Sequence, residues 1–174
     1  MALRVVKVIL AVAVVLVGIA LFLTLFIMTP TFKEANDAAF QPYSAGQIGI
    51  EEAGVRTATV LKGFMLKQTR QSDIAMIAEL RGDQGYQSAA DVPFVVAVPA
   101  FLISELRTAF TIGFLLFLPF LVIDIVVSSI LMSLGMMMLS PMLVSLPFKL
   151  LMFVIVDGWA LTLNSLVESF TRGL

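Results

Sequence analysis

The sequence contains neither cysteine nor histidine, and it carries few charged residues. Without cysteine there is no disulfide, no thiolate nucleophile and no cysteine-ligated metal. Without histidine the chain lacks the usual general base near neutral pH and the commonest transition-metal ligand. A serine–histidine catalytic triad is therefore excluded. We expect a protein that is not an enzyme and that needs no metal or cofactor.

Apolar residues fill the chain instead. Of the 174 residues, 60% are hydrophobic and 13% are charged, whereas an ordinary soluble domain carries about 25% charged residues. This composition is typical of a membrane protein or of the core of a membrane complex. The formal net charge of -1 gives no basic surface for nucleic acid. We therefore predict an all-α, membrane-associated chain that oligomerises and does not bind nucleic acid.

Hydropathy divides the chain into three parts: a hydrophobic helix in 1–30, a polar and mostly helical extracytoplasmic segment in 31–97, and an apolar helical hairpin in 98–174. Residues 8–28 carry no charge, and a helix of that length, at about 1.5 Å per residue, crosses a hydrocarbon core of about 30 Å. Basic residues precede it, which favours a cytoplasmic N-terminus. A cleaved signal peptide is the alternative, but its apolar region is only about 7–15 residues long.

Local signals predict helix ends in the polar segment. Thr31, with Glu34 three residues later, has the form of a capping box, and Pro42 would stop the short helix that starts there. The spacing of apolar residues predicts a longer helix over about 50–69. Gly82 would end the next short helix, because glycine favours the left-handed conformation after a helix.

The hairpin is predicted from a run of forty-one residues, 108–148, in which Asp124 is the one charge. Pro99 suits the first turn of the entering helix, and Pro119 should kink that helix. A last helix would follow the turn over about 147–170. Five charged residues of this part are expected to meet partners in a buried or inter-subunit contact, since charges in apolar helices face a partner or a cavity. They are Glu105, Arg107, Asp124, Lys149 and Asp157.

If the turn centres near 139–141, residues whose numbers add to about 280 lie side by side. Asp124 and Asp157 then lie at similar depth, and two carboxylates in one apolar space would not both stay ionised without partners. Lys149 is the candidate partner. An intramembrane aspartyl protease is therefore an alternative, although neither aspartate has the glycine-x-glycine-aspartate form of such enzymes. A small-solute transporter is a third possibility, but no internal repeat supports it.

Methionine is concentrated around the turn of the hairpin. Six of the ten methionines lie within twenty-one residues: Met132, Met136, Met137, Met138, Met142 and Met152. The unbranched thioether side chain is deformable and suits surfaces that must re-pack. Composition alone favours plastic packing for this cluster over a gating function.

Three stretches of the sequence resemble one known family. They are "GIALFLTLFIMTP" in 18–30, "FMLKQTRQSDIAMIAEL" in 64–80, and the long run from "VPAFLISELRTAF" to "DGWALTLNSLVESF" in 98–170. The family is FliP, the export-gate subunit of the bacterial flagellar type III secretion apparatus. The injectisome counterpart, SctR, shares much of the third stretch, but "FMLKQTR" and "SELRTAF" favour the flagellar branch. The resemblance covers the chain from about residue 14.

The resemblance implies that several copies of the chain, with FliQ-like and FliR-like subunits, form a closed, pore-containing gate. The gate would lie in the bacterial inner membrane, in the flagellar basal body, with much of it on the periplasmic side. FlhA, FlhB and FliO homologues would be further partners, and unfolded flagellar proteins would be the cargo. The methionine-rich loop of the family, a gasket that closes the pore, corresponds to Met136, Met137 and Met138.

The beginning of the chain departs from the family pattern. Family members usually carry a signal peptide and a further hydrophobic stretch before the segment that corresponds to 18–30. The chain begins almost at that segment, and residues 1–11 match nothing in the family pattern. We therefore expect either a shortened sequence or a variant without the first helix.

Overall fold

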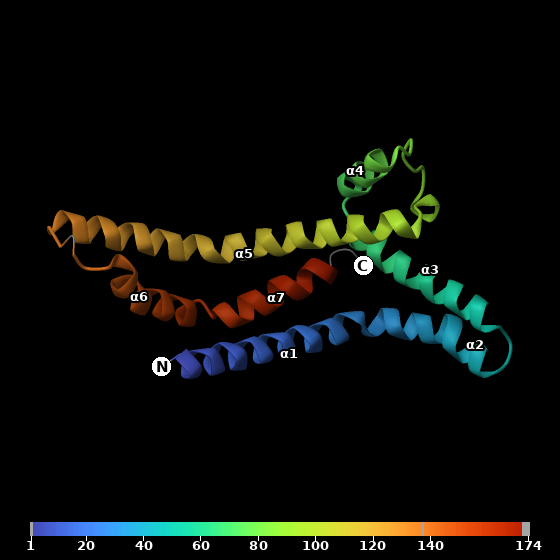
Figure 1. Cartoon of the computed structure of the whole chain (residues 1–174), viewed down its shortest axis with the longest axis horizontal. Helices are drawn as coiled ribbons and strands as arrows, with labels where there is room; N and C mark the ends of the chain where they lie inside the picture. The colour runs from blue at the N-terminus through green and yellow to red at the C-terminus, as the bar shows by residue number, and fades with distance from the viewer. Residues whose placement is uncertain (1, 137, 172–174) are drawn as a thin grey trace. The chain divides into compact units, whose positions relative to one another are not determined.

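The computed structural model describes residues 2–136 and 138–171, and every regular element in these ranges is a helix. The all-α prediction is therefore confirmed. The chain forms two compact units, Met1–Phe101 and Leu102–Leu174, which are coloured blue to yellow-green and yellow-green to red (Figure 1). Two described helices are long and apolar enough to cross a membrane, and a bent helix pair would be a third span. This supports the prediction of a membrane protein.

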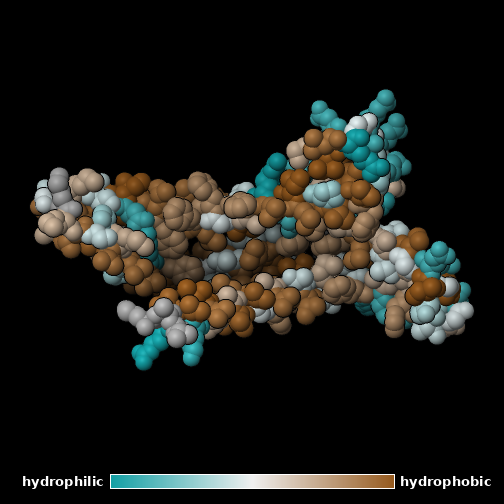
Figure 2. Space-filling model, in the orientation of Figure 1, coloured by the Kyte–Doolittle hydropathy of each residue, from teal (hydrophilic) through white to brown (hydrophobic). Residues whose placement is uncertain are grey.

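The first helix, α1 (Ala2–Ala35), is apolar on every side over residues 8–28. Most of its large hydrophobic side chains are exposed along the uncharged stretch, residues 8–28. Figure 2 shows hydrophobic surface along this helix. A helix that is hydrophobic all round is stable only in a membrane or in a large apolar assembly. Arg4–Ser44, which includes this helix, is the first of the candidate spans.

The predicted capping box at Thr31 is wrong. The helix α1 passes through Pro30 without a break and continues into a π-helix (Asn36–Phe40) and α2 (Gln41–Ser44). The side chain of Thr31 is buried instead of capping a new helix, so packing overrides the local signal. Pro42 lies in the first turn of α2 rather than ending a helix.

The π-helical turn is explained by a proline and an arginine. Pro42 has no N–H for the carbonyl of Ala38, four residues earlier. The guanidinium of Arg56 donates to that carbonyl at 3.2 Å, and it also pairs with Glu52 at 2.6 Å. Arg56 belongs to α3 (Ile50–Gln68), which agrees with the helix predicted over 50–69. This contact ties α3 to the end of the long first helix.

The core of the first unit forms where the start of α5 (Phe94–Ser133) packs against α4 (Gln71–Arg81) and α3. Its buried apolar residues are Ile74, Val92, Val96, Ala97 and Ala100. Lys62 of α3 donates to the carbonyls of Ala90 and Val92, at 2.9 and 3.1 Å. The lysine therefore fixes the chain just before α5 begins.

The helix α4 ends at Gly82, as predicted. Gly82 has a φ of 83°, its N–H donates to the carbonyl of Glu79, and the N–H of Asp83 donates to the carbonyl of Ala78, both at 2.9 Å. This double hydrogen bond is the Schellman cap that favours glycine. In the loop that follows, the hydroxyl of Tyr86 donates to the Asp83 carboxylate, and this hydrogen bond raises the pKa of Tyr86.

The helix α5 begins earlier than predicted. It starts at Phe94, because the carbonyl of Pro93 accepts the N–H groups of Val96 and Ala97 at 2.9 Å and so forms the first turn. The placement of Pro99 in that first turn is therefore wrong. Neither Pro99 nor Pro119 interrupts the helix, which is a single element of forty residues. Neighbouring groups in apolar, membrane-type helices can accommodate the hydrogen bonds that such prolines remove.

The second unit is the predicted hairpin with an unpredicted break. The part of α5 from Leu102 onwards packs beside α6 (Pro141–Ile155), and α7 (Gly158–Thr171) follows at a bend of 61°. The single last helix predicted over 147–170 is therefore wrong. The break falls at Asp157, whose φ of 50° lies in the left-handed region, where aspartate is tolerated better than most residues.

Side-chain pairs across the hairpin give its register. The rings of Phe120 and Phe153 lie 6.3 Å apart, and Asp124 pairs with Lys149. The residue numbers add to 273 in both pairs, so the predicted sum of about 280 is wrong by seven. The turn lies closer to the end of α5 than expected, because α5 stops at Ser133 and α6 already starts at Pro141. Its centre falls at the methionines.

A glycine allows the close packing at the break between α6 and α7. A Cβ atom on Gly158 would lie 2.3 Å from the ring of Phe153, and this ring also packs edge-on against Trp159, with centroids 5.6 Å apart. We predict that Gly158→Ala displaces the Phe153 ring and destabilises the unit by about 1–3 kcal/mol, as overpacking does. Trp159, the one tryptophan, reports the change through its fluorescence during thermal unfolding in detergent.

Gly113→Ala is the matched control for this substitution. Gly113 lies within α5, and a Cβ there would meet nothing within 4 Å. Alanine should therefore be neutral or stabilising by up to about 1 kcal/mol. If the two substitutions changed the stability of the unit equally, the packing of Phe153 over Gly158 would not be what fixes the bend between α6 and α7.

Candidate functional site

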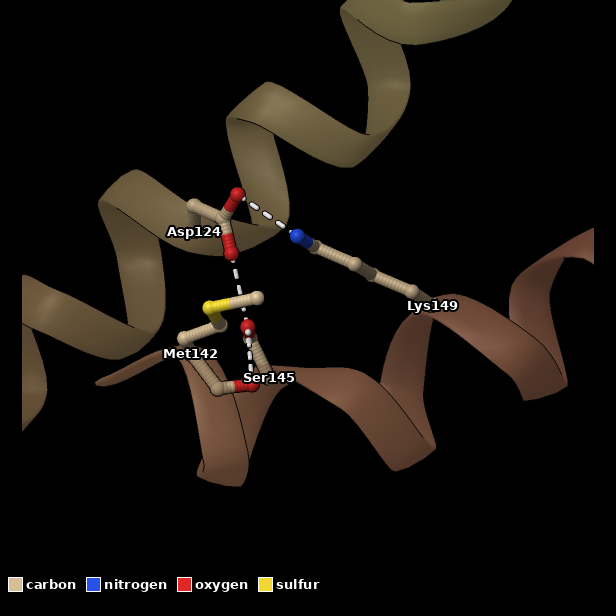
Figure 3. Close-up of polar contacts among 4 residues, drawn as sticks. All are labelled: Asp124, Met142, Ser145 and Lys149. Atoms are coloured by element: carbon tan, nitrogen blue, oxygen red, sulfur yellow. Dashed lines mark hydrogen bonds and ion pairs between the residues drawn. The ribbon is translucent and has the colours of Figure 1, made fainter. Parts of the chain in front are cut away.

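One carboxylate of α5 is held by two side chains of α6 (Figure 3). The Ser145 hydroxyl donates to one oxygen of Asp124 at 2.6 Å, and the Lys149 ammonium donates to the other oxygen at 2.6 Å. Short, charge-assisted hydrogen bonds of this kind are about twice as strong as neutral ones. We call these three residues, Asp124, Ser145 and Lys149, the polar clamp.

Helical spacing brings the members of the polar clamp together. Ser145 and Lys149 are four residues apart, so they share one face of α6. Ser145 is fully buried, while the side chains of Lys149 and Asp124 keep 23% and 37% of their exposure. Sequence reasoning proposed Lys149 as the partner of Asp124 but missed Ser145. Its position four residues before the only lysine of α6 was the available signal.

The rest of the contact between α5 and α6 is apolar. On the side of the turn, α5 and α6 enclose an open groove of about 400 Å³ whose lining includes Ile123, Val127 and Leu131 of α5 with Val144 and Phe148 of α6. We call this the apolar groove. Side chains that border so much unfilled space lose contacts that a close-packed interior would make. Directional interactions across this part of the hairpin therefore come from the polar clamp.

The methionine turn, residues 136–138, follows a tight end of α5. Gly135 has a φ of 72°, its N–H donates to the carbonyl of Met132 at 3.1 Å, and the N–H of Met136 donates to the carbonyl of Leu131 at 2.9 Å. This Schellman cap turns the chain sharply. Met136 keeps 48% of its exposure and Met138 is fully exposed, and Met137 lies outside the described residues. The hairpin therefore presents flexible apolar side chains at its tip.

The other predicted site residues do not join the polar clamp. Asp157 is exposed at the break between α6 and α7, and no hydrogen bond or ion pair joins its carboxylate to another described side chain. In the observed register it lies opposite residue 116, about 12 Å along α5 from Asp124. The predicted pairing of the two aspartates at similar depth is therefore wrong.

Glu105 and Arg107 lie further back on α5. Glu105 is half-buried and Arg107 is exposed, and their spacing of two keeps them off a common helix face. Within the described ranges, no three acidic side chains come close enough to form a metal site.

A long helix with an uncharged, apolar stretch that could cross a membrane, together with an apolar hairpin that contains an internally paired charged cluster, defines an all-α membrane protein. The chain belongs to the FliP family, which matches residues 3–166. The match begins near the N-terminus, so the expectation that residues 1–11 resemble nothing in the family is wrong.

Three relatives illustrate the similarity. The flagellar biosynthetic protein FliP of Cereibacter sphaeroides is 56% identical over 90% of this chain and 52% of its own length. The protein of the same name from Bacillus subtilis (strain 168) is 53% identical over 90% of this chain and 71% of its own length. That of Pectobacterium carotovorum subsp. carotovorum is 51% identical, with coverage of 90% and 60%. The chain thus spans about half to seven-tenths of the length of these relatives.

The polar clamp predicts a specific pattern of stability. Asp124→Leu leaves the Lys149 ammonium without its counter-charge, and Lys149→Met leaves the carboxylate with Ser145 alone. Each single substitution should destabilise the hairpin, whereas the double substitution should cost clearly less, because no charge remains in the apolar contact. Thermal unfolding of the detergent-solubilised chain measures the three values.

Asp157→Asn is the matched control for the loss of a negative charge. Asparagine also tolerates the left-handed conformation at this position, so the stability of the hairpin should change by less than about 0.5 kcal/mol. An effect as large as that of Asp124→Leu would show that Asp157, too, has a charged partner.

Proposed function

We propose that this chain is a subunit of the export gate of the bacterial flagellar type III secretion apparatus, and that its methionine turn closes the pore. The observation that carries the proposal is the hairpin itself: the polar clamp holds α5 against α6, and the turn at its tip exposes Met136 and Met138. Membership of the FliP family and the names of the relatives support the flagellar assignment. An SctR-like subunit of an injectisome is the second candidate.

A gate of this kind must satisfy two physical demands. It must stop ions and water when idle, which a narrow apolar ring does by dewetting. It must also widen around an extended polypeptide with varied side chains, which requires walls that re-pack at small cost. Methionine meets both demands, because its thioether chain is apolar and has three rotatable bonds. Several copies of the turn around one axis would supply the ring.

The exposed apolar surface supports assembly with other subunits. The described helices expose many large hydrophobic side chains, far more than a soluble monomer tolerates. We propose that several copies of the chain associate with FliQ-like and FliR-like subunits, and that homologues of FlhA, FlhB and FliO contact the complex. The location proposed is the inner membrane within the flagellar basal body, with much of the gate on the periplasmic side. Unfolded flagellar proteins are the proposed cargo.

The aspartyl protease alternative loses its main support. Such an enzyme needs two carboxylates that share a proton around one water. Both oxygens of Asp124 already accept hydrogen bonds from Ser145 and Lys149, and the register separates Asp157 from it. The polar contact between α5 and α6 therefore fits a structural function better than a catalytic one.

The gate proposal is tested by shortening the methionines. We predict that Met136, Met137 and Met138 changed together to alanine leave the complex assembled but let small ions through. Leucine or isoleucine at the three positions should keep the seal and lower export, because these side chains rearrange less easily. Ion conductance and sensitivity to small toxic solutes are measured in cells that carry each variant.

Met76→Ala is the matched control, since Met76 is a partly exposed methionine of α4 in the other unit. It should change neither conductance nor export. An intact membrane barrier in the triple-alanine variant, at normal levels of the complex, would place the seal elsewhere and return these methionines to ordinary packing.

A further inference from the structure

The two side chains that hold Asp124 differ greatly in length. Ser145 carries its hydroxyl directly on Cβ and is fully buried, whereas Lys149 reaches the carboxylate with a flexible four-carbon stem. Figure 3 shows both side chains extending from α6 towards Asp124 on α5. The two contacts are equally short, but they respond differently when one helix slides along the other.

Sliding by one helical turn moves the two helices about 5.4 Å relative to each other. The lysine stem can bend to keep its ammonium near the carboxylate over much of that distance. The serine hydroxyl cannot follow, because a contact of 2.6 Å would lengthen far beyond hydrogen-bonding distance. The ion pair therefore tolerates several registers of the hairpin, and the serine contact tolerates one.

Apolar contacts between α5 and α6 do not select one register of the hairpin either. The apolar groove is lined by valine, isoleucine, leucine and phenylalanine and is not filled. Burial of apolar surface has no preferred direction, and a loosely filled groove provides few interlocking contacts that would resist sliding. The register between the polar clamp and the turn must therefore be set by a short polar contact.

The Ser145 proton has a second acceptor within reach. A hydroxyl donates one hydrogen, and the Ser145 oxygen lies 3.3 Å from the carbonyl of Met142 as well as 2.6 Å from Asp124. The shorter, charge-assisted contact is the stronger one. If the helices slide, the hydroxyl can turn to its own helix, so a slipped hairpin leaves no buried donor unsatisfied. This makes the slipped states accessible once the Asp124 contact is lost.

We propose that Ser145 is the positioning residue that fixes the register of α5 against α6, and that it thereby sets the place of the methionine turn. The effect on the methionine turn rests on the proposed gate, because a shift of the turn along the hairpin matters for closure only if this turn closes the pore. In a ring of copies, a turn displaced by about 5.4 Å would leave the plane of the constriction.

Cysteine cross-linking measures the register directly, because the chain contains no cysteine of its own. Ser128 of α5 lies nearest Val144 in the observed register, because their residue numbers add to 272, close to the 273 of the two observed pairs. Pro141 and Phe148 lie about one turn to either side of Val144 on α6. Three double-cysteine variants pair Ser128→Cys with Val144→Cys, Pro141→Cys or Phe148→Cys in turn. In membranes that hold the assembled complex, the pair with Val144→Cys reports the native register, and the other two report slips of one turn in either direction.

The effect of Ser145→Ala is measured in these three backgrounds. We expect the ratio of in-register to slipped cross-links to fall about tenfold, the change that loss of one charge-assisted hydrogen bond produces. Ser129→Ala is the matched control: it lies in the same hairpin, and its hydroxyl donates only to the Ile125 carbonyl of its own helix, at 2.8 Å. It should leave the ratio unchanged.

A second variant separates the serine from the ion pair. Asp124→Asn combined with Lys149→Met removes both charges but keeps an oxygen that accepts the Ser145 hydroxyl. This variant should keep the native cross-linking ratio. The proposal is overturned if Ser145→Ala keeps the ratio, or if the charge-free variant loses it.

The ion conductance of Ser145→Ala separates this inference from the proposed gate. A slipped register together with a leaky membrane supports both. A slipped register with an intact barrier, at normal levels of the complex, would leave Ser145 as the positioning residue and overturn closure by the methionine turn.

Discussion

The second unit depends on how one carboxylate is accommodated in an apolar hairpin. Asp124 lies on a helix whose neighbours are almost all aliphatic or aromatic, and a charge there is costly unless it is paired. The pairing comes from α6, which supplies Lys149 and Ser145 on one face. Because these polar partners must meet Asp124, they bring α6 into one position beside α5. The Gly135 cap and the short connection between α5 and α6 then place the methionine turn at the tip of the hairpin.

The apolar surface explains why such a hairpin belongs to a larger assembly. The helix α1 is hydrophobic all round over residues 8–28, and the hairpin leaves large side chains of α5, α6 and α7 exposed. Neither feature is stable in water, and both become favourable in a bilayer or against other subunits. The first unit adds its own small core and the tie from Arg56 to the carbonyl of Ala38. Membership of the FliP family and the proposed export gate agree with this division between paired charges and unpaired apolar faces.

The sequence predicted the elements of strong periodicity and missed those set by tertiary context. The helix over 50–69, the stop at Gly82 and the apolar hairpin followed from spacing and composition, and Lys149 was proposed as the partner of Asp124. The new helix at Thr31, the start at Pro99 and the unbroken last helix were wrong, because Pro93 starts α5 and Asp157 adopts a left-handed conformation. The register was wrong by seven residues, since an apolar pattern does not show which turns face each other. Ser145 escaped notice for the same reason: a lone serine in an apolar helix becomes informative only when its partner is known.

The most direct test of the central claim is whether methionine turns from different copies meet. Met138→Cys introduces a single thiol into a cysteine-free chain, at a position that is fully exposed in the isolated chain. Mild oxidation of membranes that contain the assembled complex should link copies of the chain through this position. The same treatment of Leu80→Cys, an exposed position in α4, should yield fewer linked copies. Absence of any link at position 138, while the complex remains assembled, would contradict the account of a pore closed by this turn.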